Sequence, residues 1–182
     1  FFNQHIEAAV QLDCDHMVVS TGFAYLDVDA EDAFGWCAEA MGRIARKAEQ
    51  EGVTLAVEPF TKYTTHICNE ASQLRRLLRT VNSPRLTGLA DTDVIATTAV
   101  DTFSTFLDVI GPENLGHVHF VDGNPGGHLV PGDGVLDLDG ALEKLKAIHY
   151  TGALGLEVLD RRYVFAPEAA MKQAMDWYKE RI

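Results

Sequence analysis

The sequence has few cysteines, and their spacing excludes two classes of small stabilised domain. Its 182 residues include only three cysteines, Cys14, Cys37 and Cys68, with no Cys-x-x-Cys pair. An odd and widely spaced set predicts neither a disulfide framework nor a structural zinc motif. Unpaired cysteines are typical of reducing compartments, so we expect a cytoplasmic protein.

Basic residues and long apolar runs are also scarce. Lysine and arginine together number 15 against 27 aspartates and glutamates, for a formal net charge of −12. Because such a chain repels phosphate backbones and anionic lipid, we expect neither nucleic acid nor membrane as partners. No apolar run approaches the roughly 18 residues of a membrane span. The glycine-rich stretch 123–134 lacks GxGxxG and GxxxxGK[ST], so it predicts no phosphate-binding loop.

What the sequence does contain is one unit that recurs: a short β-branched or leucine-rich run, a polar loop, and apolar residues at helical spacing. The runs predict strands at residues 16–20, 54–58, 86–91, 115–122 and 153–159. Residues 1–12 and those from about Pro167 onward predict a helix at each end. Strands and helices that alternate about every 35 residues indicate parallel strands joined by right-handed crossovers.

Two α/β architectures use this alternation, an open doubly wound sheet and a closed TIM (β/α)8 barrel. A barrel needs eight units and about 250 residues, whereas this chain contains five predicted strands. Length alone therefore favours the open sheet, but the residues at the strand ends favour the barrel.

Ionisable side chains stand at the carboxyl ends of four successive predicted strands. They are Glu58, Asp91, His119 and Glu157. Burying a carboxylate costs several kcal/mol unless it is paired or bound to a metal. Any one of them alone would be interpreted as a helix cap or a loop hydrogen-bonder. Four in matching places indicate a shared site, since the carboxyl ends of barrel strands converge on the axis and carry the active site.

Three further residues lie on the loops of the same face. His66 follows the second predicted strand, and Asp122 and His128 follow the fourth. Loops at the functional face commonly supply substrate contacts, so we interpret these three side chains as candidate substrate-binding residues.

The order of these motifs resembles that of the xylose isomerase-like TIM-barrel sugar epimerases and isomerases. Within that family it is most similar to the fructoselysine 3-epimerases and the D-tagatose/D-psicose 3-epimerases. The resemblance rests on Glu58-Pro, Asp91-Thr, Gly116-His-Val-His119, Val130-Pro-Gly-Asp-Gly134 and Gly155-Leu-Glu157. It departs from the D-psicose type at Val94 and at Gly126-Gly-His-Leu129, which weakens the case for a free ketose as substrate.

The resemblance implies both a fold and a reaction. Residues 1–182 would be the C-terminal part of a single (β/α)8 barrel domain, with about five of its eight units. Glu58, Asp91, His119 and Glu157 would bind one divalent cation. Mn²⁺ is expected, with Co²⁺ or Mg²⁺ as alternatives, because the donor set is rich in oxygen. Glu58 and Glu157 would also be the catalytic acid and base of an isomerase, a ketose or ketose-amine 3-epimerase that works through a cis-enediolate.

Other functions remain open at this point. The same residues could serve an aldose–ketose isomerase or an inosose dehydratase, and a homo-oligomer is equally open. An endonuclease IV-like DNA repair enzyme shares the barrel, but a net charge of −12 argues against it. A non-catalytic sugar-binding remnant is the third class, and the intact set of ligands argues against it.

Overall fold

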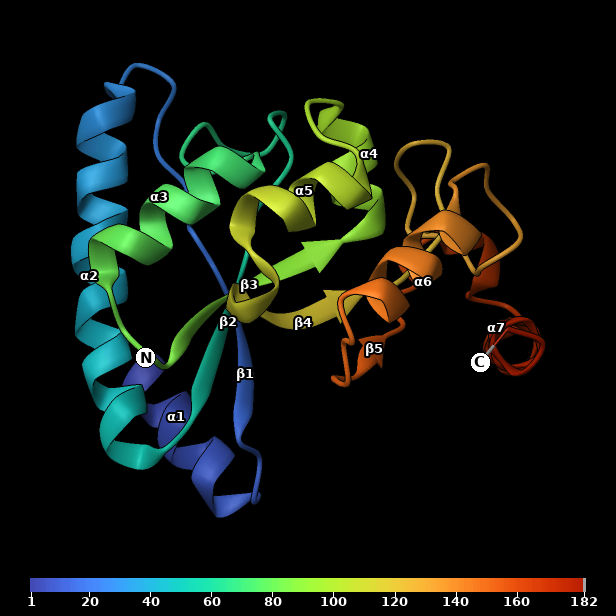
Figure 1. Cartoon of the computed structure of the whole chain (residues 1–182), viewed down its shortest axis with the longest axis horizontal. Coiled ribbons are helices and arrows are strands. Elements are labelled where there is room, and N and C mark those ends of the chain that lie inside the picture. Colours follow the sequence, from blue (N-terminus) through green and yellow to red (C-terminus); the bar gives the residue numbers. More distant parts are fainter. Residues whose placement is uncertain (182) are drawn as a thin grey trace.

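Five parallel strands pair in chain order in the computed structural model, which describes residues 1–181 (Figure 1). They are β1 (His16–Ser20), β2 (Thr54–Glu58), β3 (Leu86–Asp91), β4 (Leu115–His119) and β5 (Leu154–Gly155). Each strand lies beside its predecessor, whereas the strand order of a doubly wound sheet reverses at a switch point. The strands therefore form a half-barrel, which confirms the predicted barrel architecture.

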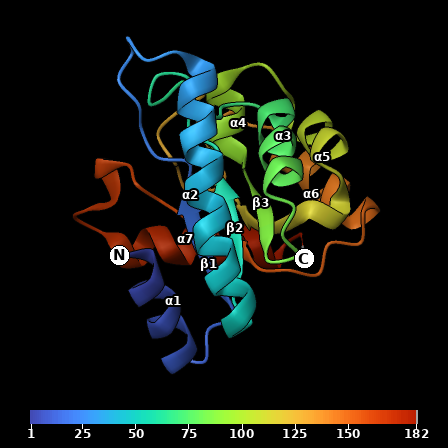
Figure 2. The ribbon, with the colours of Figure 1, turned by 90° about the vertical axis from the view of Figure 1, so that its left-hand side faces the viewer.

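The helices lie on the outer side of this wall. They are α1 (Phe2–Gln11), α2 (Ala30–Glu51), α3 (Ala71–Val81), α5 (Phe103–Ile110), α6 (Leu138–Ala147) and α7 (Pro167–Lys179). In Figure 2, α2 and α3 lie side by side in front of the strands, and α3 in turn contacts α5. Apolar residues at helical spacing face inward, as Leu74 and Leu77 of α3 show by being completely buried. None of the helices in residues 1–181 combines the length and apolar character needed to cross a membrane.

A short helix, α4 (Thr92–Thr98), follows β3 without any intervening loop. The last residue of β3, Asp91, is also its N-cap, because its side chain accepts hydrogen bonds from the backbone N–H groups of Asp93 and Val94. The sequence pattern did not predict this helix, since seven residues cover only two turns, too few for a helical periodicity to be recognised. Its position fixes the Asp91 side chain at the carboxyl end of the sheet.

Two strands are shorter than predicted. β4 ends at His119 rather than at residue 122, because Asp122 leaves the sheet and forms an isolated antiparallel bridge with Leu129. β5 has two residues instead of the seven predicted, and it pairs only through Leu154 and Gly155 with β4. Within residues 1–181 the sheet is thus open at β5, and also at β1, where Val18 is 44% exposed.

Candidate metal centre

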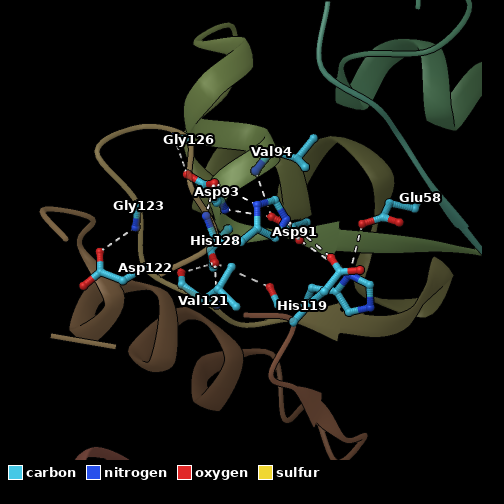
Figure 3. A network of polar contacts seen from close by, with 12 residues as sticks. Glu58, Asp91, Asp93, Val94, His119, Val121, Asp122, Gly123, Gly126 and His128 are labelled. Atoms are coloured by element: carbon cyan, nitrogen blue, oxygen red, sulfur yellow. Dashed lines mark hydrogen bonds and ion pairs between the residues drawn. The ribbon is translucent and has the colours of Figure 1, made fainter. Parts of the chain in front are cut away.

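The four predicted ligand residues come together at the carboxyl ends of the strands. Glu58, Asp91 and His119 end β2, β3 and β4, and Glu157 follows β5 by two residues. One ligand atom from each of these side chains lies within 4.8 Å of all the others. Figure 3 shows the side chains of Glu58, Asp91 and His119 directed toward one another. The pairing register explains this convergence, because Asp91 lies beside His119 and His119 beside Gly155.

The His119 ring lies at the middle of the group. Its Nδ1 atom is 3.0 Å from Oε1 of Glu58, 3.3 Å from Oε2 of Glu157 and 3.5 Å from Oδ2 of Asp91. One ring proton cannot satisfy three carboxylates, since each N–H group donates to one acceptor well. The arrangement therefore has an excess of negative charge and of lone pairs.

The two oxygens of Asp91 have different surroundings. Oδ1 accepts the backbone N–H groups of Asp93 and Val94, each at 2.8 Å. Oδ2 is buried and has no hydrogen-bond partner of good geometry among the described residues. A buried carboxylate oxygen without a partner costs free energy, and a bound cation removes that cost. Three carboxylates and one imidazole are also a donor set suited to a divalent cation, so the residues present fit a metal ion.

The electrostatics of the group agree with this fit. Burial lowers the pKa of His119, but the neighbouring carboxylates of Asp91, Glu157 and Glu58 outweigh burial and raise this pKa to about 11. Hydrogen bonds from His119 and His128 lower the pKa of Glu157 to about 2, against the opposing effect of burial. Without a cation, the cluster draws protons onto its histidines, and a divalent ion would compete for the same negative charge.

His128, predicted as a substrate contact, lies against this cluster. Its Nε2 atom is 3.3 Å from Oδ2 of Asp91 and 3.4 Å from Oε2 of Glu157. Its Nδ1 atom is 3.0 Å from Oδ2 of Asp93, a buried residue that sequence reasoning missed. The only signal for Asp93 was its place two residues after Asp91, which does not reveal that the carboxylate reaches a loop more than 30 residues away.

The Asp122 carboxylate bonds to its own loop and points away from the cluster (Figure 3). It accepts four backbone N–H groups, those of Gly123, Gly132, Gly134 and Leu136, at 2.8–3.0 Å. A Cβ atom at position 134 would lie 2.3 Å from Oδ1 of Asp122, so glycine is needed there. The carboxylate thus shapes the loop that follows β4, and its predicted contact with substrate stays a prediction.

His66 lies in the loop between β2 and α3. Both of its ring nitrogens are buried and have no hydrogen-bond partner among residues 1–181. Within residues 1–181, no hydrogen bond or ion pair joins this ring to the four-residue cluster, and its predicted contact with substrate stays a prediction.

Replacing Asp122 by asparagine is expected to lower the free energy of unfolding by about 2–4 kcal/mol. In either orientation, the amide NH₂ group would face two backbone N–H donors that now bond to a carboxylate oxygen. Urea unfolding of the full-length protein measures the loss. Asp137→Asn is the matched control, because Asp137 accepts one bond at the N-cap of α6 and asparagine caps equally well. Equal losses in the two variants would contradict the assignment.

This chain has relatives among known proteins. Residues 1–181 match the family described as xylose isomerase-like TIM barrel. The chain is similar to fructoselysine 3-epimerase from Shigella flexneri, with 26% identity over 176 residues. That alignment covers 96% of this chain and 63% of the relative, so the chain spans less than two thirds of the relative's length.

Two solved structures have the same fold as this chain. One is 3-keto-D-glucoside 4-epimerase from E. coli, with a TM-score of 0.87 and 20% identity over 98% of this chain and 69% of that one. The other is D-psicose 3-epimerase from Clostridium cellulolyticum H10, with a TM-score of 0.87 and 18% identity. It matches 100% of this chain and 69% of its own. At these identities the likeness concerns the fold alone.

Proposed function

This chain belongs to the xylose isomerase-like TIM barrel family, and we propose that it carries the metal centre of a ketose or ketose-amine 3-epimerase. The observation that carries the proposal is the convergence of three carboxylates and one imidazole around the buried Oδ2 atom of Asp91, which makes no hydrogen bond of good geometry within residues 1–181. The substrate class follows from the similarity to fructoselysine 3-epimerase, which extends over nearly the whole chain.

We expect Glu58, Asp91, His119 and Glu157 to hold one Mn²⁺ ion, with Co²⁺ or Mg²⁺ as alternatives. Carboxylate oxygens with a single imidazole favour such ions over those that select thiolates. When bound, the ion would supply Lewis-acid polarisation of the carbonyl and hydroxyl oxygens of the sugar.

We propose that the two glutamates move the proton. Inverting a carbon next to a carbonyl requires proton removal on one face and proton delivery on the other. Glu58 ends β2 and Glu157 follows β5, so they lie at the two ends of the row of ligands, with Asp91 and His119 between them. A glutamate carboxylate is the form that accepts a proton, and its protonated form is the one that delivers it.

We also propose that residues 1–182 form the C-terminal part of a single (β/α)8 barrel. Supporting this are the open edges of the sheet at β1 and β5 and the greater length of the relative. Further units that pair with these edges would close the wall and contribute the remaining contacts to the substrate. The free cysteines Cys14, Cys37 and Cys68 support a reducing, cytoplasmic setting.

The full-length protein, depleted of metal and then reloaded with Mn²⁺, tests the proposal. Incubated in D₂O with a ketose-amine, a free ketose and a phosphorylated ketose, it is expected to produce the C3 epimer of one of them with deuterium at C3. Conversion between an aldose and a ketose would indicate an isomerase instead, and loss of water from an inosose would indicate a dehydratase. Failure to bind any divalent metal would contradict the proposed centre.

A further inference from the structure

We propose that Tyr163 is a positioning residue for Glu157, and that it acts by fastening the segment after β5 to residues 130–134. The inference rests on the proposed function, since it takes Glu157 to be a metal ligand and one of the two groups that move the proton. It goes further by giving a role to the Val-Pro-Gly-Asp-Gly motif, none of whose residues belongs to the four-residue cluster.

The sheet holds Glu157 less firmly than it holds the other three ligand residues. Each of those three ends a strand of five or six residues, whereas Glu157 lies two residues beyond β5, a strand of only two. The Glu157 side chain is 38% exposed, against 11% at most for the others. Pairing with β4 ends at Gly155, and only the Leu159 N–H, which donates to the His128 carbonyl at 3.1 Å, ties the following backbone to the neighbouring loop. Contacts outside the sheet must therefore fix this carboxylate.

The two neighbours of Glu157 supply the first of these contacts. Leu156 and Val158 pack against a small apolar cluster, and the ring of Tyr163 packs against the same cluster. The buried members of this α7 cluster are Val130, Ala170 and Ala174. Because successive side chains of an extended segment point to opposite sides, packing both neighbours here turns Glu157 the other way, toward the metal ligands.

The hydroxyl of Tyr163 supplies the second contact. It accepts the backbone N–H of Val130 at 3.1 Å and donates to Oδ2 of Asp133 at 2.7 Å. Oδ1 of Asp133 accepts in turn the side-chain N–H of Gln173 in α7, also at 2.7 Å. Val130 is completely buried, so its N–H would have no water to replace this hydroxyl. One hydroxyl group thus joins the loop after β4, the segment after β5 and α7.

The composition of the motif suits this role. The N–H of Asp133 closes a turn onto the carbonyl of Val130 at 3.0 Å, and Gly132 has a φ of +97°, which favours glycine. The N–H groups of Gly132 and Gly134 donate to the Asp122 carboxylate, at 2.9 and 3.0 Å. The turn is therefore anchored to the end of β4 through its glycines, and it holds the tyrosine through its first and fourth residues. Hydrogen bonds connect the strand that carries one metal ligand with the segment that carries another.

Tyr163→Phe in the full-length protein tests the proposal, because phenylalanine keeps the ring in the α7 cluster and removes only the hydroxyl. We expect Mn²⁺ to bind about 10-fold more weakly, measured by titration calorimetry, since Glu157 is a ligand that loses its support. At saturating Mn²⁺, exchange of the C3 proton for deuterium should slow by about 10–100-fold for the epimer that depends on Glu157. That epimer is the one whose exchange Glu157→Gln abolishes. Exchange of the opposite epimer, which depends on Glu58, should keep its wild-type rate.

Tyr150→Phe is the matched control. The Tyr150 hydroxyl donates to the Ala153 carbonyl at 3.0 Å in the turn before β5, so the same atom is removed at the other end of the same strand. This variant should bind Mn²⁺ and exchange both epimers as the wild type does. Asp133→Ala, a change at an exposed residue, should show the same selective loss as Tyr163→Phe but a smaller one, because the bond from Val130 to the hydroxyl remains.

Equal slowing of both epimers in Tyr163→Phe, or wild-type affinity and exchange in that variant, would overturn the proposal and leave the proposed function intact. If Tyr163→Phe does not fold, the same two measurements on Asp133→Ala decide in the same way. A wild-type protein that binds no Mn²⁺, or that exchanges the C3 proton of neither epimer, would overturn the proposed function and this inference with it.

Discussion

Glu157→Gln in the full-length protein is expected to lower turnover by about 10²–10⁴-fold even at saturating Mn²⁺. Glutamine is nearly the same size as glutamate but cannot accept a proton. Glu58→Gln should lose turnover to a similar extent, because each glutamate serves one face of the substrate. Steady-state kinetics with the substrate identified in the screen above provide the measurement. Glu168→Gln, an exposed residue in the first turn of α7, is the control and should be as active as the wild type.

Deuterium exchange at C3 separates this assignment from simple loss of the metal. A variant that retains one base should still exchange the C3 proton of one epimer while failing to invert the carbon. The two variants should do so with opposite epimers of the substrate. If the wild type turns over without any deuterium uptake, the hydrogen migrates as hydride, and the assignment of Glu58 and Glu157 is wrong.

Asp91→Asn is expected to weaken Mn²⁺ binding by at least about 100-fold and to destabilise the metal-free protein less than Asp91→Ala does. The amide oxygen of asparagine can replace Oδ1 as the acceptor that caps α4, which leaves an uncharged NH₂ group facing the cluster. Asp91→Ala loses both the metal ligand and the cap of α4. Its free energy of unfolding should be about 0.5–2 kcal/mol lower than that of Asp91→Asn, the usual contribution of an N-cap. Titration calorimetry measures the metal affinity and urea unfolding measures the stability.

Asp29→Asn is the control for this pair of variants. Asp29 caps α2 by accepting the backbone N–H of Glu31, and it belongs to none of the residues of the metal cluster. It should change neither the affinity nor the stability. Wild-type Mn²⁺ affinity in Asp91→Asn would exclude Asp91 as a ligand, and equal stability of the two Asp91 variants would exclude its role as a cap.

Local sequence patterns were sufficient to predict most of the strands and helices and the location of the four-residue cluster. The spacing of Leu74 and Leu77 predicts a helix because helical periodicity is a property of neighbouring residues, and both side chains are buried as that period requires. Glu58 and Asp91 could be placed together for a related reason. Parallel strands with right-handed crossovers bring their carboxyl ends to one edge, whatever the intervening loops do.

Strand length was not a local property. Residues 153–159 have the composition of a strand, yet β5 contains only Leu154 and Gly155. A strand exists only where another strand offers hydrogen-bonding partners, and β5 pairs with β4 at two positions. Trp36 illustrates the same dependence: its place in the apolar period of α2 predicts burial, but no element of residues 1–181 covers it and it is 61% exposed.

The alternation of strands and helices and the four side chains at the strand ends follow from the amino-acid pattern alone, because periodicity and parallel topology are encoded locally. Only the tertiary structure revealed that Asp93 reaches Gly126 and His128, more than 30 residues away. That contact depends on a loop whose course is set by positive φ angles at Gly126, Gly127 and His128 and by the four backbone N–H groups that donate to Asp122. Neither the Asp-Thr-Asp segment nor the loop specifies the other, because long-range hydrogen bonds form only after the strands have brought their ends together.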